Sequence, residues 1–201
     1  MLLRMPRAPE EKNGQPIIEL SDRDAFERWL AANHDSPIGV WLKIAKKASR
    51  HATVTHPEAL DVALMYGWID GQRMPYDDDY FLQRFVRRTP KSKWSQVNCK
   101  KAEELIAAGR MKPGGLEQVE NAKADGRWQA AYPPQSRAPV PPDLQAALDR
   151  HPEAKAFFET LKGQRRYAFL YRLHHAARPE ARAKRIASYI ELLEAGKTLR
   201  D

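Results

Sequence analysis

Residues 68–86 read WIDGQRMPYDDDYFLQRFV, and this stretch decides the fold. Residues 69–74 and residues 80–86 are each predicted to form a short strand. Between them, Pro75 and Tyr76 precede three consecutive aspartates, which is the composition of a turn. Two strands joined in this way predict an antiparallel hairpin with a longer loop.

The sequence before the hairpin supplies a third strand and two helices. In residues 40–44 the apolar side chains alternate as they do in a strand. Ser21 is predicted to cap one helix, and Thr55 begins another with Glu58 completing a capping box. A small antiparallel sheet of at least three strands, covered by helices, buries these apolar faces. The sequence therefore predicts an α+β fold.

After the hairpin the chain becomes helical and contains a proline-rich break. Helices are predicted over residues 95–108 and 115–124, and further helices follow after residue 142. Residues 133–142 contain five prolines, which favours a stiff, extended linker. The predicted organisation is a flexible tail at residues 1–16, an α+β domain at residues 17–132, a linker at residues 133–142 and a helical C-terminal segment at residues 143–201.

The charge of the 201-residue chain is unevenly distributed. The formal net charge is +8, with a pI of about 9.6. Residues 80–112 carry a net +7 and residues 137–201 a net +5, whereas residues 1–79 carry a net −3. Such a field favours an anionic small molecule, an acidic protein, a nucleic acid or an anionic lipid as partner. A solvated surface that keeps the protein soluble explains the same charge.

Composition excludes several classes of protein. With 42% hydrophobic and 30% charged residues, the chain is neither disordered nor membrane-like in composition. No run approaches the roughly 20 apolar residues of a membrane helix, and the N-terminus does not resemble a signal peptide. The single cysteine, Cys99, excludes an internal disulfide and suits a reducing compartment, so a cytoplasmic location is predicted.

Several short motifs, taken in order, carry a family resemblance. They are Gly39–Lys43, Ala59–Gly71, Leu82–Phe85, Lys91–Asn98, Leu105–Met111 and Arg178–Ile186. Through them residues 20–197 resemble the YdeI/OmpD-associated family of bacteriocin-protection, OmdA-like proteins. In the family pattern a proline directly follows Arg-Phe-x, whereas here Arg87 and Arg88 come before Pro90. The backbone that enters this basic loop is therefore expected to differ from the family's.

The resemblance implies a role in resistance to bacteriocins or cationic peptides and an association with an outer-membrane porin. A basic protein repels cationic peptides, so any protective role is expected to be indirect. The leading hypothesis is a non-catalytic binding or stress-protection protein that recognises an anionic ligand or partner.

The candidate ligand-binding site lies between the hairpin and the following helix. Its predicted residues are Trp68, Arg73, Arg84, Ser92, Lys93, Trp94, Ser95 and Asn98. Guanidinium groups bind anions in a bidentate manner, the helix that starts at Ser95 offers N–H groups, and Trp94 would stack on a base or sugar. A purely structural interpretation stays open: Ser95 caps its helix, Asp70 pairs with an arginine, and both tryptophans fill the core.

An enzyme is the main alternative hypothesis. It would act on a small phosphorylated or carboxylated substrate, with Asp70 as the acid or base and Arg84 as the anion clamp. Strand alternation places Asp70 and Arg73 on opposite faces unless Gly71 introduces a bulge.

A nucleic-acid-binding protein is a third hypothesis. It would use the basic segment 80–112, and binding would weaken steeply with salt. The C-terminal cations Arg182, Lys184 and Arg185 would touch a nucleic acid or another anionic surface. The charged outer face of a packed helix explains them equally well.

No metal site or cofactor is predicted. The six histidines are scattered, without the converging spacing of a zinc site. Asp77, Asp78 and Asp79 lack the ligand spacing of a calcium loop. The chain contains no dinucleotide-binding, phosphate-loop or nucleophile-elbow motif.

Overall fold

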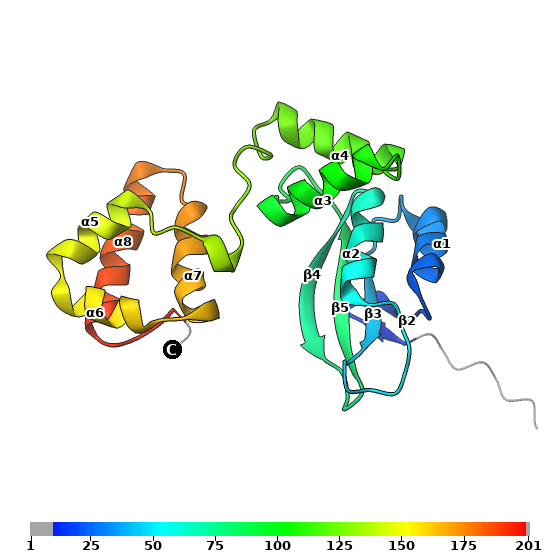
Figure 1. Cartoon of the computed structure of the whole chain (residues 1–201), viewed down its shortest axis with the longest axis horizontal. Coiled ribbons are helices and arrows are strands. Elements are labelled where there is room, and N and C mark those ends of the chain that lie inside the picture. The colour runs from blue at the N-terminus through cyan, green and yellow to red at the C-terminus, as the bar shows by residue number, and fades with distance from the viewer. Residues whose placement is uncertain (1–9, 200–201) are drawn as a thin grey trace, which may run out of the picture. The chain divides into compact units, whose positions relative to one another are not determined.

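The computed structural model describes residues 10–199, which divide into two compact units. The first unit takes in the residues up to 94 and residues 98–130, and the second takes in residues 95–97 and the residues from 131 onward. The first unit contains a β-sheet with covering helices, and the second is helical (Figure 1). All five tryptophans belong to the first unit. The fold is α+β, as predicted.

The sheet has five strands in the order β1-β2-β3-β5-β4. They are β1 (Glu11–Lys12), β2 (Gln15–Glu19), β3 (Val40–Ala45), β4 (Trp68–Pro75) and β5 (Tyr80–Arg87). The predicted hairpin is present as β4 and β5, and β3 pairs with β5 in the antiparallel sense. The prediction of a wholly antiparallel sheet is wrong for one pair of strands, because β2 runs parallel to β3. The segment between them contains a helix, which returns the chain to the starting end of the sheet.

Residues 10–16 are not the flexible tail that the sequence suggested. They form the short antiparallel pair β1–β2, in which Lys12 lies opposite Gln15. The turn between the two strands uses Asn13 and Gly14, both with positive φ. The rest of the predicted tail, residues 1–9, lies outside the described residues.

The β4–β5 hairpin contains a bulge. Asp70 lies opposite Phe85, yet Arg73 lies opposite Gln83, so β4 carries one extra residue between these two positions. The buried amide of Gln83 donates to the carbonyl oxygens of Gly71 at 3.0 Å and Gln72 at 3.3 Å. Gln83 therefore satisfies backbone acceptors that the bulge removes from the ladder.

The first two helices cover one face of the sheet (Figure 1). Helix α1 (Arg23–Asn33) is capped by Asp22, whose carboxylate accepts from the Ala25 N–H at 2.8 Å. The predicted cap at Ser21 is wrong by one residue, because its hydroxyl donates to the Asp22 carboxylate instead. Helix α2 (His56–Met65) has the predicted capping box of Thr55 and Glu58. The resulting core contains Phe26, Leu30, Val40, Leu42, Ile44, Ala59, Val62, Ala63, Phe81 and Phe85.

Helices α3 (Gln96–Ala107) and α4 (Pro113–Ala124) follow the hairpin. At the end of α2, Gly67 has φ +75°, and a Cβ atom there would lie 2.6 Å from the Gly114 carbonyl oxygen. A Cβ atom on Gly115 would lie 2.3 Å from the Met65 carbonyl oxygen. The backbones of α2 and α4 can therefore approach this closely only because the contact consists of glycines.

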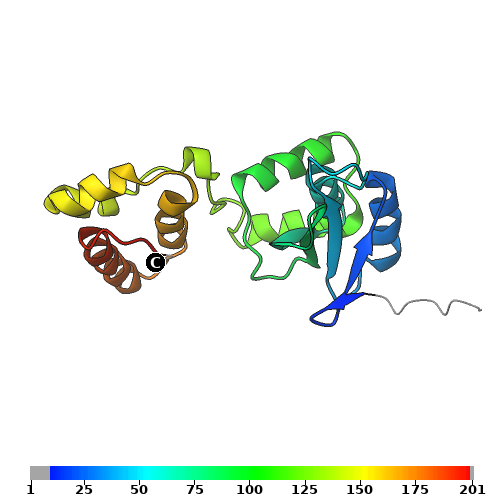
Figure 2. The same ribbon diagram turned by 90° about the horizontal axis from the view of Figure 1, so that it is seen from below.

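The second unit has its own core. It contains the 3₁₀ turn η1 (Gln135–Arg137) and helices α5 (Pro142–Arg150), α6 (Pro152–Thr160), α7 (Gly163–His174) and α8 (Pro179–Glu194). Helices α5 and α6 pack along α8, as Figures 1 and 2 show from two directions. The core is formed by apolar side chains from all four helices, among them Leu144, Phe158, Phe169, Tyr189 and Leu193.

The predicted domain boundaries stay predictions, although the chain between residues 133 and 142 is not uniformly extended. It contains η1, and Pro142 already belongs to α5 rather than to the linker. Asp143 lies in the first turn of this helix, whose cap position is Pro141. Within residues 10–199, no helix combines the length and the apolar character needed to cross a membrane.

Candidate functional site

Asp70 contacts a histidine rather than an arginine. Its Oδ2 atom lies 3.1 Å from Nε2 of His56, at the start of α2, and both side chains are about 30% exposed. The bulge at Gly71 places Asp70 and Arg73 on the same face of β4, which was the exception that the sequence allowed. The guanidinium of Arg73 stacks on the ring of Phe81 at 3.7 Å.

Arg84 lies on the other face of the sheet. It lies opposite Trp41 in the ladder, whereas its neighbour Phe85 lies opposite Asp70. Its Nε atom donates to Oε1 of Gln15 at 2.9 Å. Because successive residues of a strand project to opposite faces, the structure does not place Asp70 and Arg84 beside each other, and their joint action on one substrate stays a prediction.

Both candidate tryptophans are core residues. Trp68 is fully buried, and its indole N–H donates to the His34 carbonyl at 2.9 Å. Trp94 is 2% exposed, with Trp128 at 4.8 Å between ring centroids and the guanidinium of Arg88 over its ring at 3.6 Å. Neither indole presents a face on which a ligand would stack.

The remaining predicted residues are mostly enclosed. Ser95 and Asn98, at the start of α3, are buried. Burial lowers the pKa of Lys93, and the hydroxyl of Ser92 accepts from the Thr89 N–H at 2.9 Å. The predicted residues are thus divided between two sheet faces and the core, and the structure does not bring them into one hollow. Their role in ligand binding stays a prediction.

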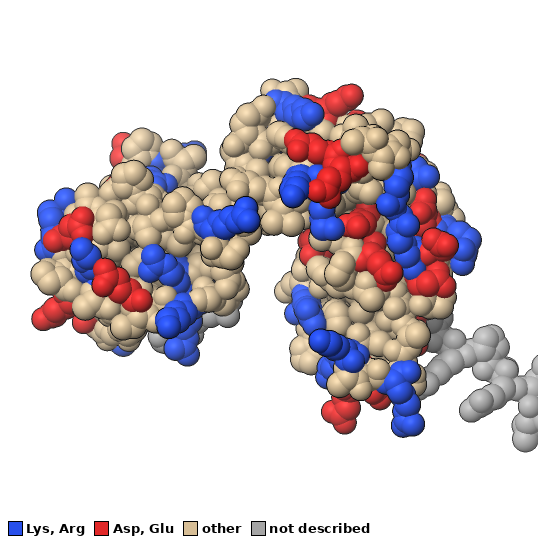
Figure 3. Space-filling view, in the orientation of Figure 1, with Lys and Arg blue, Asp and Glu red and all other residues tan. Residues whose placement is uncertain are grey.

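Three of the nine cations in the basic segment 80–112 pair with acidic residues from earlier in the chain. Lys112 pairs with Glu27 at 3.3 Å, and Lys101 pairs with Asp61. Arg87 approaches Asp35 at 3.9 Å. On the visible face of the first unit, positive and negative side chains are interspersed (Figure 3). The net +7 of this segment therefore does not form a uniform positive surface, which disfavours it as a nucleic-acid-binding site.

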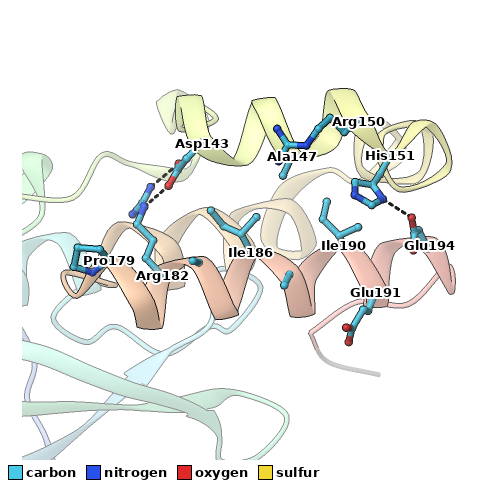
Figure 4. Close-up of a pocket in the computed structure, with 12 residues that line it drawn as sticks. Asp143, Ala147, Arg150, His151, Pro179, Arg182, Ile186, Ile190, Glu191 and Glu194 are labelled. Carbon is cyan, nitrogen blue, oxygen red and sulfur yellow. Dashed lines mark hydrogen bonds and ion pairs between the residues drawn. The ribbon is translucent and has the colours of Figure 1, made fainter.

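The second unit contains a groove of 610 Å³ between α5 and α8 (Figure 4). At one end Arg182 binds the Asp143 carboxylate in a bidentate manner, with Nη2 to Oδ1 at 2.9 Å, and this contact lowers the pKa of Asp143. At the other end Nδ1 of His151 lies 2.7 Å from Oε1 of Glu194. Apolar side chains such as Ile186 lie between these pairs. The groove is therefore charged, but its main ionic groups satisfy one another.

A second hollow of 610 Å³ lies beside α7 and α8 and has a different electrostatic character. We call it the α7–α8 pocket; its lining residues are Arg172, Ala181, Lys184, Arg185, Ser188, Tyr189 and Leu199. Ala181, Lys184, Arg185 and Ser188 recur at the spacing of one helix face, so α8 presents them together. Among the described residues that line the α7–α8 pocket, Arg172, Lys184 and Arg185 are cationic and none is Asp or Glu. One Arg185 nitrogen donates to the Arg172 carbonyl at 2.7 Å, which holds this guanidinium against the end of α7.

Tyr189 closes the inner side of the α7–α8 pocket. It is 3% exposed, and its ring packs edge-to-face on Phe169 with 4.9 Å between centroids. Within residues 10–199 its buried hydroxyl has no hydrogen-bond partner. Burial raises the pKa of Tyr189, while the charges of Arg185 and Arg172 offset part of the rise. The hydroxyl is therefore a protonated donor near two guanidinium groups, and it lacks an acceptor.

Two family models match the chain. Residues 18–118, half of its length, match the model described as a domain of unknown function (DUF8412). Residues 137–196 match the model described as "Bacteriocin-protection, YdeI or OmpD-Associated", or OmdA. The chain belongs to the family of the first model, and its residues 137–196 match the second model. The predicted YdeI/OmpD-associated family is thereby confirmed, and we refer to residues 137–196 as the OmdA domain. No curated protein and no solved structure gives a significant match.

The family match and the sequence motifs fall on different parts of the chain. Of the motifs that carried the resemblance, only Arg178–Ile186 lies in the OmdA domain. The others lie within residues 18–118, which the first model covers. Both the groove and the α7–α8 pocket are built mainly from the OmdA domain.

The sequence contained part of the signal for the α7–α8 pocket. Arg182, Lys184 and Arg185 stood out as cations of one helix, but helical geometry separates them. Arg182 turns toward α5 and binds Asp143, whereas Lys184 and Arg185 lie on the side of α7. The sequence did not single out Arg172 and Tyr189 as site residues, because only the packing of two helices places them beside these cations.

Proposed function

We propose that the protein is a non-catalytic binding protein whose OmdA domain recognises an anionic ligand in the α7–α8 pocket. The observation that carries this proposal is the set of three cations, Arg172, Lys184 and Arg185, around a hollow whose described lining contains no carboxylate. Phosphate and carboxylate groups are the ligands that such a set favours, because guanidinium and ammonium donors form charge-assisted hydrogen bonds with them.

The buried hydroxyl of Tyr189 supports the same ligand class. A buried donor without an acceptor costs free energy, and an anionic oxygen would supply the missing acceptor. The hydroxyl of Ser188 adds a further donor at the pocket surface.

A binding role fits this pocket better than catalysis. Arginine and lysine side chains are donors without an acceptor, and the raised pKa of Tyr189 keeps its phenol protonated near neutral pH. A general base is therefore missing from the described lining of the pocket.

The family description of the OmdA domain concerns bacteriocin protection. Because the pocket is positive, it would repel a cationic peptide. We therefore propose that any protection is indirect and depends on an anionic ligand or an acidic partner. We propose the cytoplasm as the place of action, since the single cysteine suits a reducing compartment.

Isothermal titration of the full chain with pyrophosphate and with citrate at low salt tests the proposal. Lys184→Glu should weaken binding by about tenfold or more, because it reverses one charge of the pocket. Lys47→Glu changes the net charge equally, but Lys47 is an exposed residue of the first unit. This control should bind as the wild type does.

Two results would contradict the proposal. One is an equal loss in both variants, which would show that only net charge matters. The other is the lack of measurable binding at millimolar concentrations. A single-stranded oligonucleotide tests the nucleic-acid hypothesis in the same assay: tight binding that survives Lys184→Glu and falls steeply with salt would favour another surface.

A further inference from the structure

A smaller and more enclosed hollow of 320 Å³ lies between α7 and the proline-rich segment of the second unit. Helix α7 contributes Tyr167, Leu170, Tyr171 and His174, which share one helix face. The opposite wall comes from residues 132–141 and includes three prolines. Arg172 points away from this face, so this hollow and the α7–α8 pocket use different sides of α7. We call it the tyrosine pocket.

The walls of the tyrosine pocket are aromatic and preformed. The ring centroids of Tyr132 and Tyr171 are 5.0 Å apart with the rings nearly perpendicular, and those of Tyr167 and Tyr171 are 5.7 Å apart at 48°. The imidazole of His175 also lies edge-to-face with Tyr171, with 4.6 Å between ring centroids. The hydroxyl of Tyr167 donates to the Pro133 carbonyl at 2.9 Å, which ties the proline-rich wall to α7.

The tyrosine pocket also has a definite charge. Arg137, the last residue of η1, lines it and is exposed, and His174 lies on the α7 side. Among its described lining residues there is no Asp or Glu. Aromatic walls alone would suit a cationic ligand, but a guanidinium without a neighbouring carboxylate in the lining repels cations and attracts anions.

From these features we infer that the tyrosine pocket binds a planar aromatic acid of one or two rings. The ring would lie against Tyr171 and the prolines, and the carboxylate would face Arg137. The volume of 320 Å³ is at the lower end of the range for small-molecule sites, which suits a ligand of this size. Prolines restrict the backbone of the wall, so little ordering is needed on binding. This inference is independent of the α7–α8 pocket.

Three matched compounds test the inference by isothermal titration of the full chain. They are 2-naphthoate, its uncharged amide 2-naphthamide, and the saturated, non-planar decahydro-2-naphthoate. We expect 2-naphthoate to bind most tightly, by about tenfold over each of the others, because only this compound has both the planar ring and the charge. Saturation-transfer NMR should show the naphthalene protons in contact with the protein.

Variants assign the binding to this pocket. Arg137→Gln should weaken 2-naphthoate by about tenfold and leave 2-naphthamide unchanged. Tyr171→Leu should weaken both aromatic compounds. Arg165→Gln removes an exposed cation from the other side of α7 and should have no effect, and neither should Lys184→Glu.

Because Tyr171→Leu removes a partly buried ring and would also lower stability, Arg137→Gln provides the decisive comparison. Equal affinity for the three compounds would overturn the inference. So would equal losses from Arg137→Gln and Arg165→Gln, or no binding of 2-naphthoate at millimolar concentration.

Discussion

Replacing Tyr189 with phenylalanine separates stability from binding in the OmdA domain. The substitution removes only the buried hydroxyl, which has no hydrogen-bond partner within residues 10–199, and keeps the ring that packs on Phe169. Tyr167→Phe is the matched control, because it removes a hydroxyl that does donate, to the Pro133 carbonyl at 2.9 Å. The same chemical change at two positions of the second unit should therefore have opposite effects.

The expected magnitudes follow from these contacts. An unsatisfied buried polar group costs about 1–3 kcal/mol, so Tyr189→Phe should raise the free energy of unfolding by about 1 kcal/mol. Tyr167→Phe gives up one hydrogen bond, and should lower the free energy of unfolding by about 1 kcal/mol. For a unit of this size, about 1 kcal/mol corresponds to a change in Tm of roughly 4–8 °C.

Calorimetry and far-UV circular dichroism of the full chain measure these shifts. Tryptophan fluorescence provides an internal reference, since all five tryptophans belong to the first unit. In the presence of saturating pyrophosphate, the wild type should gain stability through ligand binding, and Tyr189→Phe should gain less. If Tyr189→Phe instead destabilises the protein as much as Tyr167→Phe does, the hydroxyl of Tyr189 has a partner in the folded state. The argument for a missing acceptor would then be refuted.

Three further outcomes are expected from other parts of the molecule. Gly67→Ala should lower the free energy of unfolding, measured by urea denaturation, by at least about 2 kcal/mol more than Gly126→Ala does. Both positions have positive φ, but only a Cβ atom at Gly67 would meet backbone atoms. Equal losses in the two variants would remove the steric argument. Because Arg182 holds the pKa of Asp143 below its ordinary value of 3.8, this pair stabilises the folded state above that pH and loses its contribution as the pH falls further. Asp143→Asn should therefore cost about 0.5–1 kcal/mol at pH 7 and close to nothing near pH 2, and a pH-independent cost would contradict this. Burial raises the pKa of the Cys99 thiol from 9.0 to about 11. Because the thiolate is the reactive form, a disulfide reagent at pH 8 should modify the folded protein about a hundredfold more slowly than the urea-unfolded chain. Equal rates would show that the thiol is accessible.

The fold was predictable where the sequence repeats a pattern over enough residues. The alternation in residues 40–44 and the capping box of Thr55 and Glu58 each act locally, so both could be predicted. The parallel strand β2 could not, because Ile17 and Ile18 are too few to show a period, and its partner comes 20 residues later. Pairing direction is a property of the chain connection rather than of either strand.

The candidate site was harder to predict for a physical reason. Tryptophan and arginine serve equally well in a binding surface and in a core, and the sequence does not distinguish the two. Trp94 and Arg88 show this, because their stacked contact is buried. Conversely, Arg172 is unremarkable in sequence, and the pocket that it shares with Lys184 exists only because α7 and α8 pack against each other.

The two outer strands of the sheet have a consequence for the behaviour of the protein at high concentration. At one edge, β1 has only two residues, and at the other, β4 carries the bulge between Asp70 and Arg73 and ends at Pro75. A foreign strand needs a long, straight row of backbone donors and acceptors before it can extend a sheet. Neither edge offers such a row, so both edges of the sheet disfavour edge-to-edge aggregation.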